Sequence, residues 1–161
     1  MIDMAGKKVL GYGNTRARII LVGEAPGAEE EKQGKPFVGR SGKLLNKALE
    51  KAGIRREDLF ITNVVKLRPP GNKKPKSSEV RECRPVLLRE IEAIEPEVVC
   101  LLGSTAIECL LGKYPVTKYR GKIIEKDGSR FLVTFHPAAV LRNPNRMGDF
   151  VSDIRKLKKF L

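Results

Sequence analysis

Residues 18–27 read RIILVGEAPG, and this stretch decides the fold. Its first six residues form a short run of branched apolar side chains, which predicts a buried strand. The run ends in a turn rich in glycine and proline, whose backbone N–H groups are free to meet a ligand. Two later stretches repeat the apolar run, LFITNVV at residues 59–65 and VVCLLG at residues 98–103. Three buried strands are therefore expected.

Segments with helical periodicity separate these strands. Residues 41–52 begin at Ser41, the expected N-cap, and Gly53 closes them. The other expected helices are residues 77 or 78 to about 94 with a bend near Pro85, residues 104–111, and residues from about 146 onward. Asp127-Gly128, between residues 122–125 and 130–135, indicates a hairpin.

Strands that alternate with helices form parallel sheets covered on both faces. The expected fold is therefore α/β: a three-layer α/β/α sandwich with a central, mainly parallel four-stranded sheet plus a small hairpin. Residues 1–161 are expected to form a single domain.

The chain is strongly basic. Of its 161 residues 41% are hydrophobic, and 32 Lys and Arg against 19 Asp and Glu give a formal net charge of +13. Such a charge favours a polyanionic partner, because neutralising phosphates releases condensed counterions. General solubility with weak non-specific binding is the alternative reading of the same charge.

Three features bear on the compartment. No apolar run approaches the ~20 residues that span a bilayer, and Met1 to Lys8 lacks the apolar stretch of a secretory signal. Cys83, Cys100 and Cys109 are scattered and form no CxxC pair, which argues against a disulfide scaffold. We expect a cytoplasmic protein without membrane contact.

Ligands of parallel sheets bind at the carboxyl ends of the strands. Phe37 follows the first strand in a polar, glycine-flanked loop, where it is a stacking platform for a base or plugs a gap. Asn63 near the end of the second strand has an amide that both donates and accepts, which suits a pyrimidine edge or a structural cap. His136, the only histidine, ends another strand before Pro137. These residues predict one site.

A basic, proline-stiffened loop follows Asn63. Residues 66–76 read KLRPPGNKKPK and carry five cationic side chains beside the predicted site. Stiffness favours a surface that contacts phosphates over a merely solvated loop.

Three motifs together resemble the family 4 uracil-DNA glycosylases of the uracil-DNA glycosylase superfamily. They are GEAPGAEEEKQGKPFVGRSG at residues 23–42, TNVVKLRPPGNKKP at residues 62–75 and HPAAVLRNP at residues 136–144. The resemblance runs from about Val9 to the last helix. It implies a DNA-repair enzyme that flips uracil out of single- or double-stranded DNA and hydrolyses its N-glycosidic bond, leaving an abasic site.

The resemblance also implies roles for residues around the base. Phe37 stacks on the uracil and Asn63 pairs with its polar edge. Glu30 fills the side where the methyl group of thymine would lie. His136 bonds the O2 atom of uracil and stabilises the charge that develops on the leaving base.

Other residues are implied to meet the sugar and the DNA. The backbone from Gly23 to Ala25 holds the base, and Glu24 lies near the sugar. In the best-known branch of the superfamily an Asp activates the water, but Ala25 stands at that position. Glu24 is the nearest substitute, as a base or only as a positioning group. The expected DNA-binding residues are Arg68, Lys73, Lys74, Leu141 and Arg142.

The sequence departs from the family pattern in the cysteines that would hold a cofactor. Typical members hold a 4Fe–4S cluster on four cysteines, but this sequence starts after the first pair, Leu67 takes the third position and only Cys83 matches the fourth. One ligand of four cannot hold such a cluster. The expectation is a protein without cofactor or metal, in which apolar packing around Leu67 and Cys83 replaces the cluster.

Two other functions stay open at this point. The same scaffold could act on another deaminated base such as hypoxanthine, although Glu30 and Asn63 favour uracil. A catalytically weak DNA-binding homologue is the other alternative, and the joint presence of Phe37, Asn63 and His136 speaks against it. The partner is DNA in each case, and we expect a monomer.

Overall fold

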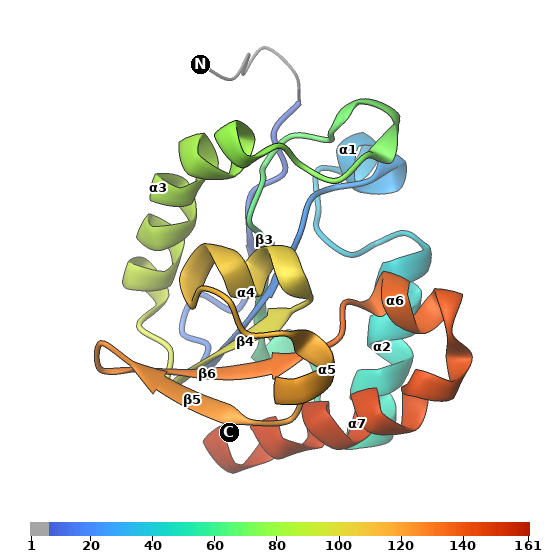
Figure 1. Ribbon diagram of the computed structural model, residues 1–161, viewed down its shortest axis with the longest axis vertical. Helices are drawn as coiled ribbons and strands as arrows, with labels where there is room; N and C mark the ends of the chain where they lie inside the picture. Colours follow the sequence, from blue (N-terminus) through green and yellow to red (C-terminus); the bar gives the residue numbers. More distant parts are fainter. Residues whose placement is uncertain (1–6) are drawn as a thin grey trace.

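The structure is a computed structural model that describes residues 7–161. Residues 1–6, most of the stretch expected to lack a secretory signal, lie outside the described residues. A six-stranded sheet in the order β1-β3-β2-β4-β6-β5 runs through the molecule, with helices on both faces (Figure 1). The described residues contain no helix that is long and apolar enough to cross a membrane.

The four central strands of the sheet are parallel. They are β3 (Phe60–Asn63), β2 (Ile19–Gly23), β4 (Val98–Leu102) and β6 (Ser129–Thr134). Two antiparallel strands complete the edges, β1 (Tyr12–Gly13) beside β3 and β5 (Ile123–Lys126) beside β6. The predicted four-stranded parallel sheet is confirmed, and the predicted hairpin joins it, because β6 is both a hairpin strand and the fourth parallel strand.

Side chains of the central strands alternate between two apolar layers. Ile19 and Leu21 of β2 pack toward α2 (Arg40–Ala52), α6 (Pro137–Arg142) and α7 (Met147–Arg155). Ile20 and Val22 pack toward the opposite layer. The helices of that layer are α3 (Ser77–Ile94) and α4 (Ser104–Leu110). Strands buried on both faces explain the unbroken apolar runs in the sequence.

Several helix ends differ from those expected. Helix α2 begins after Gly39 rather than Ser41; no side chain caps it, and the Glu30 carboxylate accepts the N–H of the N-cap residue Gly39 at 2.7 Å. Helix α3 begins after Lys76 rather than Ser77 or Ser78, since Glu79 bonds the Lys76 N–H in a capping box. The last helix continues as a 3-10 turn, Lys156–Phe160.

Short elements were not expected from the sequence. They are helices α1 (Ala28–Gln33) and α5 (Val116–Tyr119), helix α6, and the 3-10 turns Arg56–Asp58, Pro70–Asn72 and Pro144–Arg146. Each has six residues or fewer, too short for a periodic pattern to identify.

Strand β2 lies between β3 and β4, the strands that follow it in the chain. The chain therefore runs from β2 to β3 on one side and then, through α3, crosses back past β2 to β4 on its other side. In open parallel sheets a crevice for ligands forms at such a point, outside the carboxyl ends of the strands. Gly23 and Asn63 end β2 and β3 side by side in register.

Candidate active site

A cavity of about 350 Å³ opens at the carboxyl ends of β2 and β3. Its wall comes from the segment after β2, the end of β3, the loop before α3 and the start of α6. The lining residues are Glu24 to Glu30, Phe37, Gly39 to Ser41, Asn63, Pro69, Asn72, Lys73 and His136. The cavity thus brings together Phe37, Asn63 and His136, which are far apart in the sequence.

Gly23, the last residue of β2, lies beside two of the residues that line this cavity, Phe37 and Asn63. A β-carbon at this position would overlap the far end of the Phe37 ring and lie 2.5 Å from Asn63 Oδ1. Real β-carbons do not approach other atoms so closely, so only glycine lets both side chains occupy their places. The absence of a side chain at the last residue of β2 therefore leaves room for Phe37 and Asn63.

Phe37 holds an unusual backbone conformation. Its φ of 52° lies in the left-handed region, which costs free energy for a residue other than glycine. Arg56 holds the segment in place, because its guanidinium donates to the Pro36 oxygen at 2.8 Å and to the Phe37 oxygen at 2.9 Å. Gly42 leaves room for the same Phe37 carbonyl. The ring is only 4% exposed and lines the cavity.

Asn63 is 2% exposed and lines the cavity. Its Oδ1 is the one buried side-chain oxygen or nitrogen in residues 7–161 that has no hydrogen-bond partner. A buried acceptor left unpaired costs about 1–3 kcal/mol, and such groups in native proteins call for a specific explanation. A ligand that carries an N–H group and enters the cavity would satisfy this atom.

His136 is the N-cap of α6, and its Nδ1 accepts the Ala138 N–H at 3.0 Å. The proton of the neutral ring is therefore on Nε2. Burial, together with the smaller effect of the positive charge of Arg142, lowers the pKa of His136 to about 4. The imidazole is consequently a neutral donor near pH 7, and its ring centre lies 5.6 Å from that of Phe37.

Glu24 and His136 also line a second hollow of about 220 Å³. The Thr105 hydroxyl donates to Glu24 Oε1 at 2.5 Å, which fixes the carboxylate between the two hollows. Ala25 lines the first cavity only and has no side chain that could act on water. The Glu24 carboxylate is therefore the anionic group between the base-sized cavity and the hollow beside it.

Glu30 lines the cavity with a carboxylate that is already engaged. One oxygen accepts the Gly27 N–H at 3.0 Å, and the other accepts the N–H groups of Val38 at 2.9 Å and Gly39 at 2.7 Å. The side chain therefore caps α1 and fixes the loop that carries Phe37. These three bonds make this part of the wall rigid.

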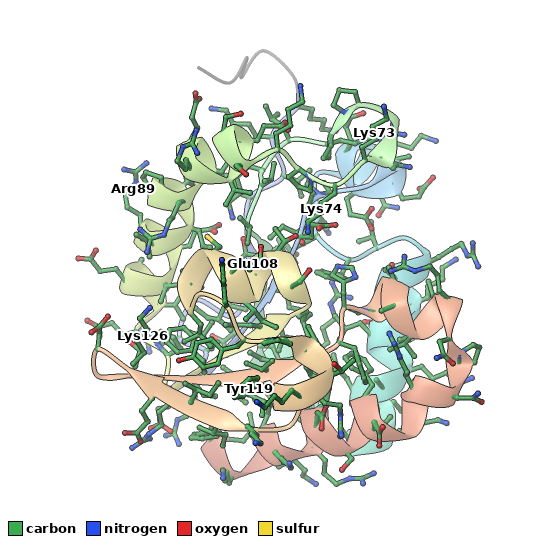
Figure 2. All side chains as sticks on the ribbon, viewed as in Figure 1. Lys73, Lys74, Arg89, Glu108, Tyr119 and Lys126 are labelled. Atoms are coloured by element: carbon green, nitrogen blue, oxygen red, sulfur yellow. The ribbon has the colours of Figure 1, made fainter. Side chains whose placement is uncertain are left out.

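The cationic side chains of the loop after β3 lie in different surroundings. Lys73 lines the cavity, whereas Lys74 lines another hollow between α3 and α4 (Figure 2). Arg68 bonds the Asn72 side chain at 2.8 Å and lies 3.8 Å from Glu31. Lys66 is wholly buried, so the prediction that all five cations of this loop form a phosphate-contacting surface is wrong for Lys66.

Leu141 and Arg142 do not share a surface. Arg142 lines the second hollow, together with Arg146 from the turn that follows α6. Leu141 lines a separate groove of about 490 Å³ between α2 and α6. Neither residue lines the cavity that holds Phe37 and Asn63.

Three residues that hold the site together were not predicted from the sequence. Arg56 anchors the Phe37 segment, Thr105 holds Glu24, and Lys66 bonds the main chain of Asn63. Arg56 and Thr105 lie on elements that the sequence links to no function. The unbroken apolar run before Lys66 was the only local indication of its burial.

The cysteines are free and lie on separate elements, Cys83 on α3, Cys100 on β4 and Cys109 on α4. Within residues 7–161 no group of three or more His, Cys, Asp or Glu side chains could hold a metal ion. Burial raises the pKa of the Cys100 and Cys109 thiols, which disfavours the thiolate that a metal requires.

The chain is similar to several proteins named type-4 uracil-DNA glycosylase. The protein from Thermotoga maritima is 47% identical over 158 residues, which cover 95% of this chain and 82% of that protein. Those from Saccharolobus solfataricus and Archaeoglobus fulgidus are 44% and 42% identical, and the matches cover 95% and 92% of this chain and 76% and 79% of those proteins. Residues 10–158 match the Uracil DNA glycosylase superfamily, so this chain belongs to that superfamily.

Proposed function

We propose that this protein is a DNA-repair glycosylase that removes uracil from DNA by hydrolysing its N-glycosidic bond. The observation that carries the proposal is the unpaired, buried Oδ1 of Asn63 in the cavity wall. Uracil presents an N–H between two carbonyl oxygens, so it donates to Oδ1 and accepts from the amide nitrogen of the same side chain. Cytosine has an unprotonated N3 instead, whose lone pair would face Oδ1 and repel it.

The leaving base develops negative charge as the bond breaks. His136 is neutral with its proton on Nε2, so the Nε2–H group donates a hydrogen bond to the O2 atom of uracil. Such a preorganised donor stabilises an oxyanion, and its removal typically costs about 10²–10³ in rate. Phe37 stacks on the base and aligns it with this donor.

The sugar develops positive charge in the same step. Glu24 supplies a carboxylate beside the base cavity, and its bond from Thr105 holds it there. It stabilises the cationic sugar and orients the attacking water, a role that Ala25 cannot perform. Glu24, His136 and Asn63 are the proposed catalytic residues.

Thymine is excluded by the wall that Glu30 holds. Its carboxylate is fixed by three backbone N–H groups and cannot swing away without leaving them unpaired. We place the C5 edge of uracil against this wall, with the backbone of Gly23 to Ala25 beneath the base. A methyl group at C5 would press against this wall.

The DNA lies across the mouths of the two hollows. Lys73 at the cavity and Arg142 at the second hollow contact phosphates on either side of the flipped nucleotide, with Arg68 and Lys74 farther along the loop. Leu141, half-buried beside α2, enters the gap that the flipped base leaves. We expect one catalytic domain acting as a monomer in the cytoplasm, in keeping with three free cysteines.

The 4Fe–4S cluster implied by the family resemblance does not fit the residues present. Leu67 has no donor atom, and Cys83 is buried in an apolar cluster with Val65 and Leu87. We propose that this packing replaces the cluster and that the protein works without a cofactor. Iron analysis and the visible spectrum test this, and a broad band at roughly 400 nm would contradict it.

The activity is tested on single- and double-stranded oligonucleotides that carry uracil, thymine, cytosine or hypoxanthine at one position. Alkali then cleaves any abasic site. We expect cleavage with uracil only, a loss of about 10²-fold or more in the Asn63→Ala and His136→Ala variants, and no loss in Asn14→Ala on the exposed turn after β1. Cleavage with no substrate, or with hypoxanthine in preference to uracil, contradicts the proposal.

A further inference from the structure

A buried cation stands directly behind the base-recognition residue. Lys66 is fully buried, and its Nζ donates to three oxygens: the Asn63 main-chain oxygen at 2.6 Å, Thr62 Oγ1 at 2.6 Å and Glu90 Oε1 at 2.5 Å. Thr62 and Asn63 are the last two residues of β3. The ammonium group therefore bonds both residues at the end of the strand from which the Asn63 side chain projects.

Glu90 extends this network to other parts of the molecule. It lies on α3, and its Oε1 also accepts the Thr62 hydroxyl at 2.8 Å, while its Oε2 accepts the Gly11 N–H at 2.6 Å. The Lys66–Glu90 pair thus links the end of β3 to a helix on one face of the sheet and to the segment before β1. All three protons of the ammonium have an acceptor.

A buried ion pair contributes little net stability, because removing both charges from water costs free energy that offsets their attraction. Burial lowers the pKa of Lys66, and the adjacent Glu90 opposes that shift. Replacing a buried ion pair by well-packed apolar side chains is often neutral or stabilising, so general stability does not explain its presence. The direct bond to the Asn63 carbonyl suggests a different role.

Contact with DNA does not explain Lys66 either. Its side chain has no exposed surface, unlike Lys73 on the same loop. The peptide group that it bonds is the one that follows the Asn63 α-carbon, so a shift of this group would also displace the side chain that carries the unpaired Oδ1.

We propose that Lys66, held by Glu90, is a positioning residue that orients Asn63 for base recognition. This inference rests on the proposed function, because it assigns Lys66 to the same step. A displacement of about 1 Å in a reacting or recognising group can cost up to about 10²-fold in rate. Loss of Lys66 therefore lowers kcat for uracil release and leaves DNA affinity unchanged.

The test separates positioning from folding. Lys66→Met alone leaves the Glu90 carboxylate without its cation and therefore destabilises the fold. The informative variant is thus the double change Lys66→Met with Glu90→Met. We expect this variant to regain most of the stability lost by Lys66→Met in urea unfolding, yet to keep kcat about 10- to 100-fold below the parent with KM within about twofold. Arg89→Met, next to Glu90 on the exposed side of α3 (Figure 2), is the matched control and keeps the parent kcat.

Coupling to Asn63 is the decisive readout. In an Asn63→Ala background the double change should cause no further loss of kcat, because there is no amide left to orient. A return of kcat to the parent value in the folded double variant, or losses that multiply with that of Asn63→Ala, would overturn the inference.

A readout without catalysis distinguishes this inference from the proposed function. The side-chain amide signals of Asn63 in an NMR spectrum, assigned by their loss in Asn63→Ala, should shift in the Lys66→Met, Glu90→Met variant and stay in place in Arg89→Met. Unshifted signals overturn the positioning role. If the parent releases no uracil but the signals shift, the proposed function fails and the positioning role stands.

Discussion

The α-carbon of Gly23 lies so close to the ring of Phe37 that a β-carbon at position 23 would overlap the ring. The same β-carbon would lie 2.5 Å from Asn63 Oδ1. One small residue at the end of β2 thus sets the spacing of the two side chains that enclose the proposed base. The width of the cavity depends on this spacing.

Gly23→Ala should impair both catalysis and stability. We expect a loss of about 10²-fold in kcat/KM as the Phe37 and Asn63 side chains are displaced, and an unfolding free energy lower by about 1–3 kcal/mol from overpacking. Steady-state kinetics and urea unfolding measure both. Gly148→Ala on α7, where a β-carbon meets no other atom within 4 Å, is the control and should keep full activity. Equal rates for the two variants would contradict the role of Gly23.

The single histidine should titrate well below its ordinary range. Because burial lowers the pKa of His136 to about 4, its NMR signal should move near pH 4 in the folded protein and near pH 6.5 in urea. A pKa lower in the folded state means that His136 stabilises the fold above about pH 6.5 and loses this contribution as the pH falls toward 4. A folded-state midpoint near 6.5 would show that the imidazole is not desolvated.

Arg56→Met should weaken the stacking platform. The change removes the donors to the Pro36 and Phe37 oxygens, so the strained Phe37 backbone is free to relax, and we expect a roughly tenfold lower kcat/KM with about 1–3 kcal/mol less stability. Arg55→Met, at the neighbouring exposed residue, is the matched control. If both variants behave alike, Arg56 has no particular role in holding Phe37.

Glu24→Gln should lower kcat while leaving binding intact. The glutamine keeps an oxygen for the Thr105 hydroxyl but loses the negative charge, so we expect a 10- to 100-fold drop in kcat and little change in KM. Glu108→Gln, on the exposed side of α4 (Figure 2), changes the same charge outside both hollows and should behave as the parent. An unchanged kcat for Glu24→Gln would remove this residue from the mechanism.

DNA affinity should fall steeply with salt and depend on the cation at the second hollow. Arg142→Ala should reduce the slope of log K against log salt by about one, because one phosphate contact is lost. Fluorescence anisotropy with a labelled oligonucleotide at several salt concentrations measures this slope. Arg89→Ala, on the outer side of α3, removes the same charge and should leave the slope unchanged. Equal slopes for all three proteins would place the phosphates elsewhere.

Much of the fold was predictable because its signals are local. The apolar runs at residues 18–23, 59–65 and 98–103 correspond to β2, β3 and β4, and alternating strands and helices indicate a parallel sheet. Where the chain makes distant contacts, local patterns misled. Glu30 bonds the Gly39 N–H across nine residues, so α2 begins before the residue that local capping preferences select.

The sequence by itself determined which residues reach the site, because a side chain at the carboxyl end of a parallel strand lies at the sheet edge wherever the strand is placed. Asn63 and His136 follow from that rule, whereas Phe37 lies beyond α1 and its segment is held by Arg56. Only the tertiary structure decided their chemical state. Lys66 meets Glu90 across 24 residues and Thr105 meets Glu24 across 81, and burial makes His136 neutral and leaves Asn63 Oδ1 unpaired. Burial and pairing depend on elements that meet only when the whole sheet and its helices are assembled.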